Sequence, residues 1–386
     1  MPWEGVSAMD KRVEFVIRAR ELGSNKSELC REYGISRKTG YQALERYEEE
    51  GLAGLAPRSR APKNFPKALN GEVVCAIIKQ RQKHHGWGAR KIQSLLEREN
   101  ELESVPSIRS IERVLGRCGL ITKRRKRRPK AIPDGEIIQA QEPNDVWTID
   151  FKGDWKMKNG KRCYPLTLRD ECTKYILDIS GLEGTQSAAT KERLKICFSK
   201  YGLPKYIRSD NGGPFACIRG VAGLSKLSAW WVKLGIIPNR IPLASPQYNG
   251  GHERMHKDMM QELERYPLQN LEQEQRRFND WKEEFNHVRP HESLSMRCPA
   301  DVYIKSTRRY DPSEPEFEYP DDVEVRQVCK RGMFSWQGTR KFLSNALAEE
   351  RIAIQFEDHG MISLWFCELL LGCTDQHLDI PLKERQ

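Results

Sequence analysis

The stretch "NDVWTIDFKGDW" restricts the fold of this chain more than any other part of the sequence. Side chains alternate between the two faces of a β-strand, so Val146, Thr148 and Asp150 share one face of a predicted strand. Large apolar side chains occupy the other face. Asp150 is therefore an acid held in the middle of an otherwise apolar strand.

The segments that follow predict an α/β sheet with helices on its faces. "KRCYPLTLRDECTKYILDISG" supplies two more β-rich runs, and "TQSAATKERLKICFSKYGLP" predicts a helix ended by Gly202 and Pro204. "KYIRSDNGGPF" predicts a strand whose following turn exposes Asp210. A helix over "LSKLSAWWVKLG", a strand over "IIPNRI" and a long helix carrying Glu253 in "SPQYNGGHERMHKDMMQELERY" complete the pattern. Three strands able to pair antiparallel, followed by alternating helix and strand, favour an α/β fold.

The first sixty residues predict a helix-turn-helix. A helix over "DKRVEFVIRARELG" is followed by a short helix that Ser27 can cap and Gly34 ends, and by a second helix that runs to about Glu50. A plain helical hairpin with a solvated charged face is the alternative. The start of the second helix carries groups able to reach phosphates and base edges, namely Ser36, Arg37, Lys38, Thr39, Tyr41 and Gln42.

Basic segments continue towards residue 128. "GLAGLAPRSRAPKNFPKA", which contains Arg58, predicts an extended linker lying along a DNA backbone. A second helical block includes "VPSIRSIERVLGRCGL", in which Ser107 caps a helix with Arg109 and Arg113 facing outward. "TKRRKRRPK" follows, and we expect it to contact phosphates rather than to form a solvated tail or a localisation signal. Its predicted DNA contacts are Arg124, Arg125, Lys126, Arg127 and Arg128.

Charge and composition favour an anionic partner. The formal net charge is +11, which points to nucleic acid, or less often to an anionic membrane. The sequence has no apolar run long enough to span a bilayer and no signal-peptide pattern at its N-terminus, so we expect a cytoplasmic protein. Eleven cysteines without a C-x-x-C pair predict reduced thiols and give no support for a zinc finger.

The segment "NGGHERMHKD" allows two interpretations. His252, Glu253 and His256 match H-E-x-x-H, in which two histidines bind zinc and the glutamate is a general base of a peptidase. Glu274, Glu283 and Glu284 lie downstream as possible third ligands. The same helix suits a nuclease in which Glu253 binds Mg²⁺ and the histidines lie on a face that meets DNA. A peptidase explains neither the basic linkers nor Asp150 and Asp210.

Four segments resemble the insertion-sequence transposases of the retroviral-integrase superfamily: "WTIDFKG", "SDNGGPF", "SPQYNGGHERMHKD" and "FNHVRPHESLSMRCPADVY". The resemblance covers about residues 140–305 and implies a ribonuclease-H-like core with a D-D-E triad. Carried over to this sequence, the triad is Asp150, Asp210 and Glu253, which are the predicted catalytic residues and metal ligands. The interval between the last two acids is longer than is usual in the family.

The resemblance also implies a reaction and partners. We expect a bacterial, nucleoid-associated transposase that binds the terminal inverted repeats of a mobile element and catalyses DNA cleavage and strand transfer with two Mg²⁺ or Mn²⁺ ions. Its partners would be double-stranded DNA and further copies of the chain, as a dimer or tetramer. A DNA-binding regulator with an inactive core is the alternative function. Near the triad, the predicted DNA contacts are Asn249, His252, His256 and Lys257.

The remaining segments complete a multidomain prediction. After the core, a Pro- and acid-rich linker precedes a small all-β domain, and the role of the "RPHESL" loop is open. The predicted parts are a helix-turn-helix domain (1–62), a second helical DNA-binding domain with a basic tail (63–128), a linker (129–144), the α/β core (145–307), a linker (308–322) and the β domain (323–386).

Overall fold

The computed structural model describes residues 8–58, 69–121, 138–217, 220–242, 250–314, 316–357 and 360–375. The chain divides into two compact units, Met1–Leu69 and Asn70–Gln386. The predicted boundary between residues 62 and 63 lies outside the described residues.

The first unit is a three-helix bundle formed by α1 (Ala8–Ala19), α2 (Lys26–Glu32) and α3 (Arg37–Glu50). The helices pack around a buried cluster that includes Phe15 and Cys30. Gly40 permits the close approach of α3, because a Cβ atom there would lie 2.5 Å from Cys30 Sγ. The helix-turn-helix pattern is confirmed.

The caps of these helices agree with the sequence at one position and differ at another. Ser36 caps α3 as predicted, and its Oγ accepts from the backbone N–H of Thr39 at 3.1 Å. The prediction that Ser27 caps α2 is wrong. The side chain of Asn25 performs this role by accepting from the N–H groups of Ser27 and Glu28, since the helix begins two residues earlier than the pattern suggested.

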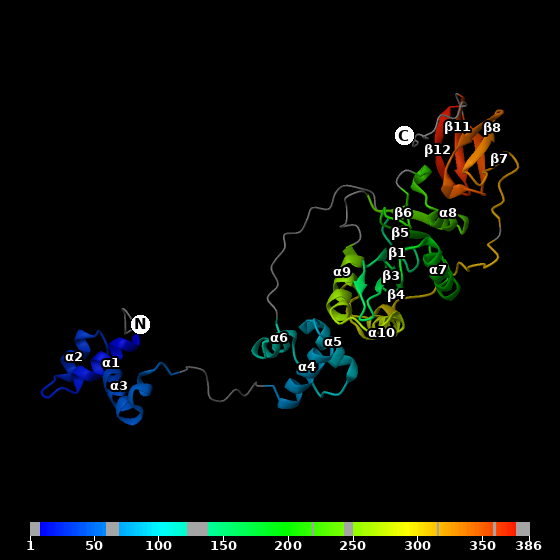
Figure 1. Ribbon diagram of the computed structural model, residues 1–386. Helices are drawn as coiled ribbons and strands as arrows, with labels where there is room; N and C mark the ends of the chain where they lie inside the picture. The colour runs from blue at the N-terminus through cyan, green and yellow to red at the C-terminus, as the bar shows by residue number, and fades with distance from the viewer. Residues whose placement is uncertain are drawn as a thin grey trace. The chain divides into compact units, whose positions relative to one another are not determined.

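The second unit begins with three helices and continues into a mixed sheet (Figure 1). The helices are α4 (Gly71–Lys83), α5 (Ala89–Glu99) and α6 (Ile108–Arg117). The strands are β1 (Val146–Phe151), β2 (Trp155–Lys156), β3 (Arg162–Asp170), β4 (Ile176–Leu182), β5 (Tyr206–Ser209) and β6 (Ile237–Arg240).

Strands β4, β3 and β1 pair antiparallel, and β5 and β6 extend the sheet in parallel with β1. Helices α7 (Ser187–Tyr201) and α8 (Lys226–Lys233) cover one face, and α9 (Gly250–Met259) and α10 (Leu271–Glu283) cover the other (Figure 1). The expected α/β core with helices on both faces is confirmed.

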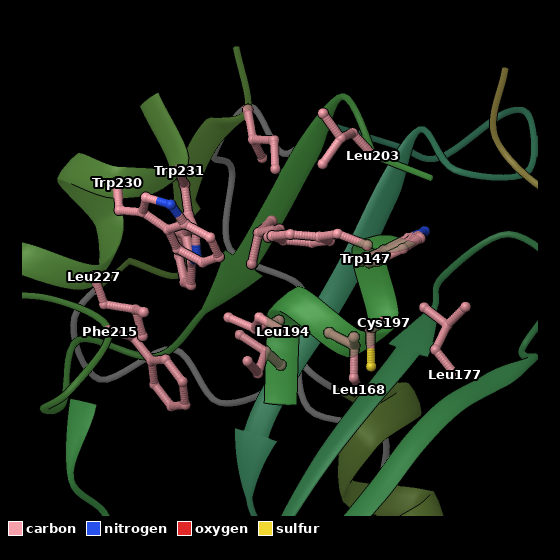
Figure 2. Packing of buried hydrophobic residues seen from close by; sticks show 14 of the residues in the cluster. Trp147, Leu168, Leu177, Leu194, Cys197, Leu203, Phe215, Leu227, Trp230 and Trp231 are labelled. Atoms are coloured by element: carbon pink, nitrogen blue, oxygen red, sulfur yellow. The ribbon is translucent and has the colours of Figure 1, made fainter. Parts of the chain in front are cut away.

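The main core lies between the sheet and α7 and α8. Trp147 of β1 packs with Cys197 of α7 and with Trp230 and Trp231 of α8 in a largely apolar cluster (Figure 2). The alternation predicted for β1 is therefore correct: its large apolar side chains face this cluster. Its polar side chains face α9.

The C-terminal part forms a four-stranded antiparallel sheet and a hairpin. The sheet contains β7 (Glu324–Gln327), β10 (Arg351–Phe356), β11 (Met361–Phe366) and β12 (Leu369–Asp375), and the hairpin contains β8 (Met333–Trp336) and β9 (Thr339–Phe342). Its apolar side chains cluster with Ala229 and Val232 of α8. The all-β prediction is confirmed, and this sheet packs on the core through α8.

Candidate active site

Asp150 lies near the end of β1, opposite Thr167 of β3. Its side chain is 24% exposed. Burial, followed by the negative charges of Asp210 and Glu253, raises the pKa of the Asp150 carboxyl to about 7. Asp210 and Glu253 therefore each lie within electrostatic reach of Asp150.

Asp210 follows β5 directly and is exposed. Its Oδ1 accepts from the backbone N–H of Gly212 at 3.1 Å, which braces the turn. The strand end therefore directs this carboxylate outward, as the sequence predicted. Bracing the turn uses one oxygen lone pair and leaves others for a further ligand.

Glu253 is exposed in the first turn of α9. The start of this helix is held against β3, because Gly251 lies on the guanidinium of Arg169 and a Cβ atom there would collide with it. Asn249 lies outside the described residues, whereas Lys257 is exposed on α9.

The two histidines of "HERMH" point into the molecule. His252 is fully buried, at 0% exposure, so the prediction that it contacts DNA is wrong. The side chain of His256 is only 13% exposed. Helix α9 covers the polar face of the sheet, and this packing turns the two rings inward while Glu253 remains outside.

Both rings form hydrogen bonds with Thr167. Its Oγ1 donates to the backbone oxygen of Asp150 at 2.9 Å and lies 2.8 Å from Nε2 of each histidine. This network assigns Nε2–H to both rings, since a hydroxyl has one proton and two lone pairs. Nδ1 of His252 lies 2.7 Å from the hydroxyl of Thr148, which also donates to the backbone oxygen of Arg169 at 3.3 Å.

Both rings are neutral in this environment. Burial lowers the pKa of His252 well below its usual value, with a smaller contribution from His256. Burial and then the charge of Lys152 lower the pKa of His256 to about 3. The pair therefore supports the backbone of Asp150 without adding charge beside it.

The residues proposed as third zinc ligands are engaged elsewhere. Glu274 is buried and accepts hydrogen bonds from Trp155 Nε1 and from the backbone N–H of Leu268. Glu283 forms an ion pair with His287, and Glu284 forms one with His84. Within the described ranges, no group of three or more His, Cys, Asp and Glu residues is arranged to hold a metal ion. The zinc-peptidase interpretation of this helix thus has no geometric support.

The sequence interpretation missed Thr148, Thr167 and Arg169. Strand register places Thr167 opposite Asp150, and places Thr148 opposite Arg169 and Arg208. Arg169 is 3% exposed and pairs with Glu171. The alternation of "RCYPLTLRD" contained this signal, because Thr167 and Arg169 share a face, but the strand register was needed to place that face beside Asp150.

The carboxylate set has the chemistry that Mg²⁺ and Mn²⁺ prefer, namely hard oxygen ligands with access to solvent. Asp150 is held by its strand, whereas Asp210 and Glu253 are exposed at the start of a turn and of a helix. A divalent cation would relieve the repulsion that raises the pKa of Asp150. These residue types therefore suit such an ion, but in the described part of the chain the three carboxylates are not gathered into a metal-binding arrangement.

The candidate DNA contacts in the first unit lie along the start of α3. Arg37, Lys38, Tyr41 and Gln42 are exposed, and Thr39 is half-buried. The hydroxyl of Ser36 is occupied as the helix cap. Arg58 of the first unit pairs with Glu50. In the second unit, Arg109 and Arg113 are exposed on α6, and residues 124–128 lie outside the described residues.

All eleven cysteines are free thiols, as predicted. No helix in the described part of the chain is both long and apolar enough to cross a membrane.

Three family models match the chain. A helix-turn-helix domain matches residues 11–63, a homeodomain-like domain matches residues 39–115, and an integrase core domain matches residues 234–299. The last range contains Glu253 and the "RPHESL" loop, while Asp150 and Asp210 precede it.

Proteins of two bacterial insertion elements are similar to this chain. The insertion element IS407 uncharacterized 31.7 kDa protein of Burkholderia multivorans is 25% identical over 62% of this chain and 83% of its own length. The insertion element IS476 uncharacterized 39.2 kDa protein of Xanthomonas euvesicatoria is 28% identical over 64% of this chain and 69% of its own length. A structure of the HTLV-2 integrase catalytic core domain in complex with magnesium matches 43% of this chain and 100% of that chain, with 16% identity and a TM-score of 0.32.

Proposed function

The chain belongs to the insertion-sequence transposases of the retroviral-integrase superfamily, and from this premise we propose that it cleaves and joins the ends of a mobile DNA element. It would bind the terminal inverted repeats and transfer the cleaved strands to target DNA. The observation that carries the catalytic proposal is the placement of the three acids: Asp150 on β1, Asp210 directly after the neighbouring strand β5, and Glu253 exposed in the first turn of α9. The charges of Asp210 and Glu253 add to the burial that raises the pKa of Asp150.

Asp150, Asp210 and Glu253 would hold Mg²⁺ or Mn²⁺. A pair of such ions supplies charge stabilisation for the attacking and leaving oxygens of an in-line displacement at phosphorus. The protein contributes three carboxylates from different elements: one on a strand, one on a braced turn and one on a helix start. Thr167 and the neutral histidines hold the backbone of Asp150, so its position does not depend on solvent.

Asp150 must lose its proton to serve as a ligand. With a pKa of about 7, its carboxyl is partly protonated near neutral pH in the absence of a cation. Ion binding and proton release are therefore coupled at this residue. The proposed site should take up divalent ions more readily as the pH rises through 7.

Exposed basic side chains support the DNA-binding part of the proposal. The start of α3 presents Arg37 and Lys38, and α6 presents Arg109 and Arg113. Two helix-turn-helix elements on one chain would read a longer sequence than one element reads. We further propose that a dimer or tetramer assembles on the DNA, since two element ends must be processed together.

Nicking of plasmid DNA that carries the element ends tests the proposal. Asp150→Asn should abolish Mg²⁺- or Mn²⁺-dependent nicking and leave end binding almost unchanged, because it removes a ligand charge with little change in volume. Asp154→Asn is the matched control, since the Asp154 side chain is 25% exposed just beyond the same strand and pairs with Arg162. Specific end binding without nicking by the wild type would instead favour the regulator with an inactive core.

A further inference from the structure

Arg289, in the "RPHESL" loop, is a buried cation that joins three parts of the second unit. It is 5% exposed, and its Nη2 donates to Asp258 Oδ2 of α9 at 2.5 Å. Its Nη1 lies 3.8 Å from Glu262 Oε1, and its guanidinium carbon lies 5.8 Å from the centre of the Trp87 ring. Trp87 belongs to the helical segment that precedes the catalytic core.

The contacts of Arg289 coincide with two irregular helix segments. Helix α9 changes to a π-helix at Met260–Glu264, which begins two residues after Asp258, and α10 changes to a π-helix at Glu284–Val288, directly before Arg289. π-helical turns are rare and are often found at functional sites. Arg289 thus follows the π-helical segment that ends α10. It binds Asp258, which precedes the π-helical segment of α9, and it lies near Glu262 within that segment.

The helical segment from α4 to α6 is attached to the core at this point. Trp87 is 2% exposed and stacks on His84 with ring centres 4.1 Å apart, and Nδ1 of His84 lies 2.7 Å from Glu284 Oε1. Farther along α5, Arg98 donates to the backbone oxygen of Met296 at 2.8 Å. The end of α4, the turn that follows it and helix α5 therefore supply the docking contacts.

Helix α6 is oriented differently. Its residues Ile111, Val114 and Leu115 are buried, whereas Arg109, Arg113 and Arg117 are exposed. These cations remain available to DNA while α5 contacts the core.

From these contacts we propose that Arg289 is a positioning residue that transmits the docking of α4 and α5 to the catalytic helix and so sets the position of Glu253. Asp258 lies five residues after Glu253, about 7.5 Å along the same helix. The pair between Arg289 and Asp258 holds α9 just before its π-helical segment, and Trp87 covers the guanidinium. Rotation or sliding of α9 would break these contacts and move Glu253. This inference rests on the proposed role of Glu253 as a metal ligand.

Two substitutions disturb this connection at different points. Trp87→Leu removes the aromatic cover of Arg289 and changes no group on the core. Arg289→Lys retains a positive charge next to Asp258 but loses the planar fork and its stacking. Removing that charge with Arg289→Ala would leave the buried Asp258 with only its 3.6 Å pair to the exposed Arg254, and loss of a buried partner is strongly destabilising. Lysine is therefore the informative replacement.

Arg90→Ala is the matched control. Arg90 lies on α5 and pairs with Glu292 of the same loop at 3.3 Å, but both side chains are more than half exposed. Such exposed pairs contribute little. The control removes a cation from the same junction without touching Arg289.

The measurement is Mn²⁺ binding by the full chain in complex with end DNA, followed by electron paramagnetic resonance, with Asp150→Asn defining the signal of the site. We expect Trp87→Leu and Arg289→Lys each to weaken Mn²⁺ binding about three- to tenfold, at or below the lower limit of the effects seen for residues that directly orient metal ligands. Affinity for end DNA should stay at the wild-type level. The variant that carries both substitutions should bind Mn²⁺ no more weakly than the single variant with the lower Mn²⁺ affinity, because both changes break the same connection.

Mn²⁺ isotherms of folded Trp87→Leu and Arg289→Lys that superimpose on the wild-type isotherm would overturn the inference. Equal weakening by Arg90→Ala would also overturn it, because the effect would then belong to the junction as a whole. If Trp87→Leu does not fold by circular dichroism, Arg289→Lys decides. Failure of the wild type to cleave DNA while Mn²⁺ binds would refute the proposed function, and the isotherms would still decide this inference.

Discussion

Asp150→Asn should stabilise the metal-free protein while it removes activity. Burial and neighbouring carboxylates raise the pKa of Asp150 from 3.8 to about 7. A carboxyl whose pKa is higher in the folded than in the unfolded state destabilises the fold as the pH rises from the lower value to the higher one. Asparagine has no such charge, so its advantage should grow over that range.

The size of the effect follows from the shift. At about 1.4 kcal/mol per pKa unit, full ionisation of Asp150 costs at most about 4 kcal/mol. The difference between about pH 5 and about pH 8 is at most about 2–3 kcal/mol, because part of the cost is already present at the lower pH. The side chain is 24% exposed, so screening by solvent reduces this further.

The assay is denaturant unfolding of the full chain without divalent ions, followed by tryptophan fluorescence, at both pH values. The quantity of interest is the change in the free energy of unfolding on Asp150→Asn at pH 8 minus the same change at pH 5. Effects of the substitution that do not depend on pH cancel in this difference, and Asp154→Asn should give a difference near zero. A difference near zero or of opposite sign for Asp150→Asn would refute the argument that its carboxyl is destabilised by burial and like charge.

Two further predictions concern the start of α9 and the first unit. Gly251→Ala should lower both the melting temperature and the rate of DNA cleavage, because its Cβ would collide with the Arg169 guanidinium. In the control Gly250→Ala the added Cβ meets nothing within 4 Å, so both quantities should stay at the wild-type level. Equal losses in the two variants, measured by calorimetry and DNA nicking, would contradict this prediction. Arg37→Ala combined with Lys38→Ala should weaken end binding and reduce the slope of log affinity against log salt by up to about 2, as expected for two lost phosphate contacts. An unchanged slope in fluorescence anisotropy titrations would remove these two side chains from the interface.

Much of the fold could be predicted because its signals are local. The alternation of apolar and polar residues in β1 placed Asp150 on the face opposite Trp147, as the structure shows. Ser36 and Gly202 mark helix ends through a side-chain oxygen and a positive φ angle, which are properties of single residues. Asn25 and Ser27 are both capping residues, and the local pattern could not choose between them.

The surroundings of the acids depended on contacts between distant segments. The histidines of "HERMH" are compatible with either face of a helix, and only the packing of α9 on β1 and β3 turned them towards Thr167. The raised pKa of Asp150 needs Asp210 and Glu253 near it, which pairing of β1 with β5 and the placement of α9 provide.

The role of Arg289 likewise has no local signal. Its partners Trp87 and Asp258 lie far from it in the sequence, and the π-helical segments beside it are not encoded by any simple periodicity. The sequence by itself determined the helices, the strands and the acids that the strands carry, because backbone preference and side-chain alternation act over a few residues. Only the tertiary structure decided which charges are buried together, because burial and electrostatic repulsion depend on groups that the folded chain brings into contact.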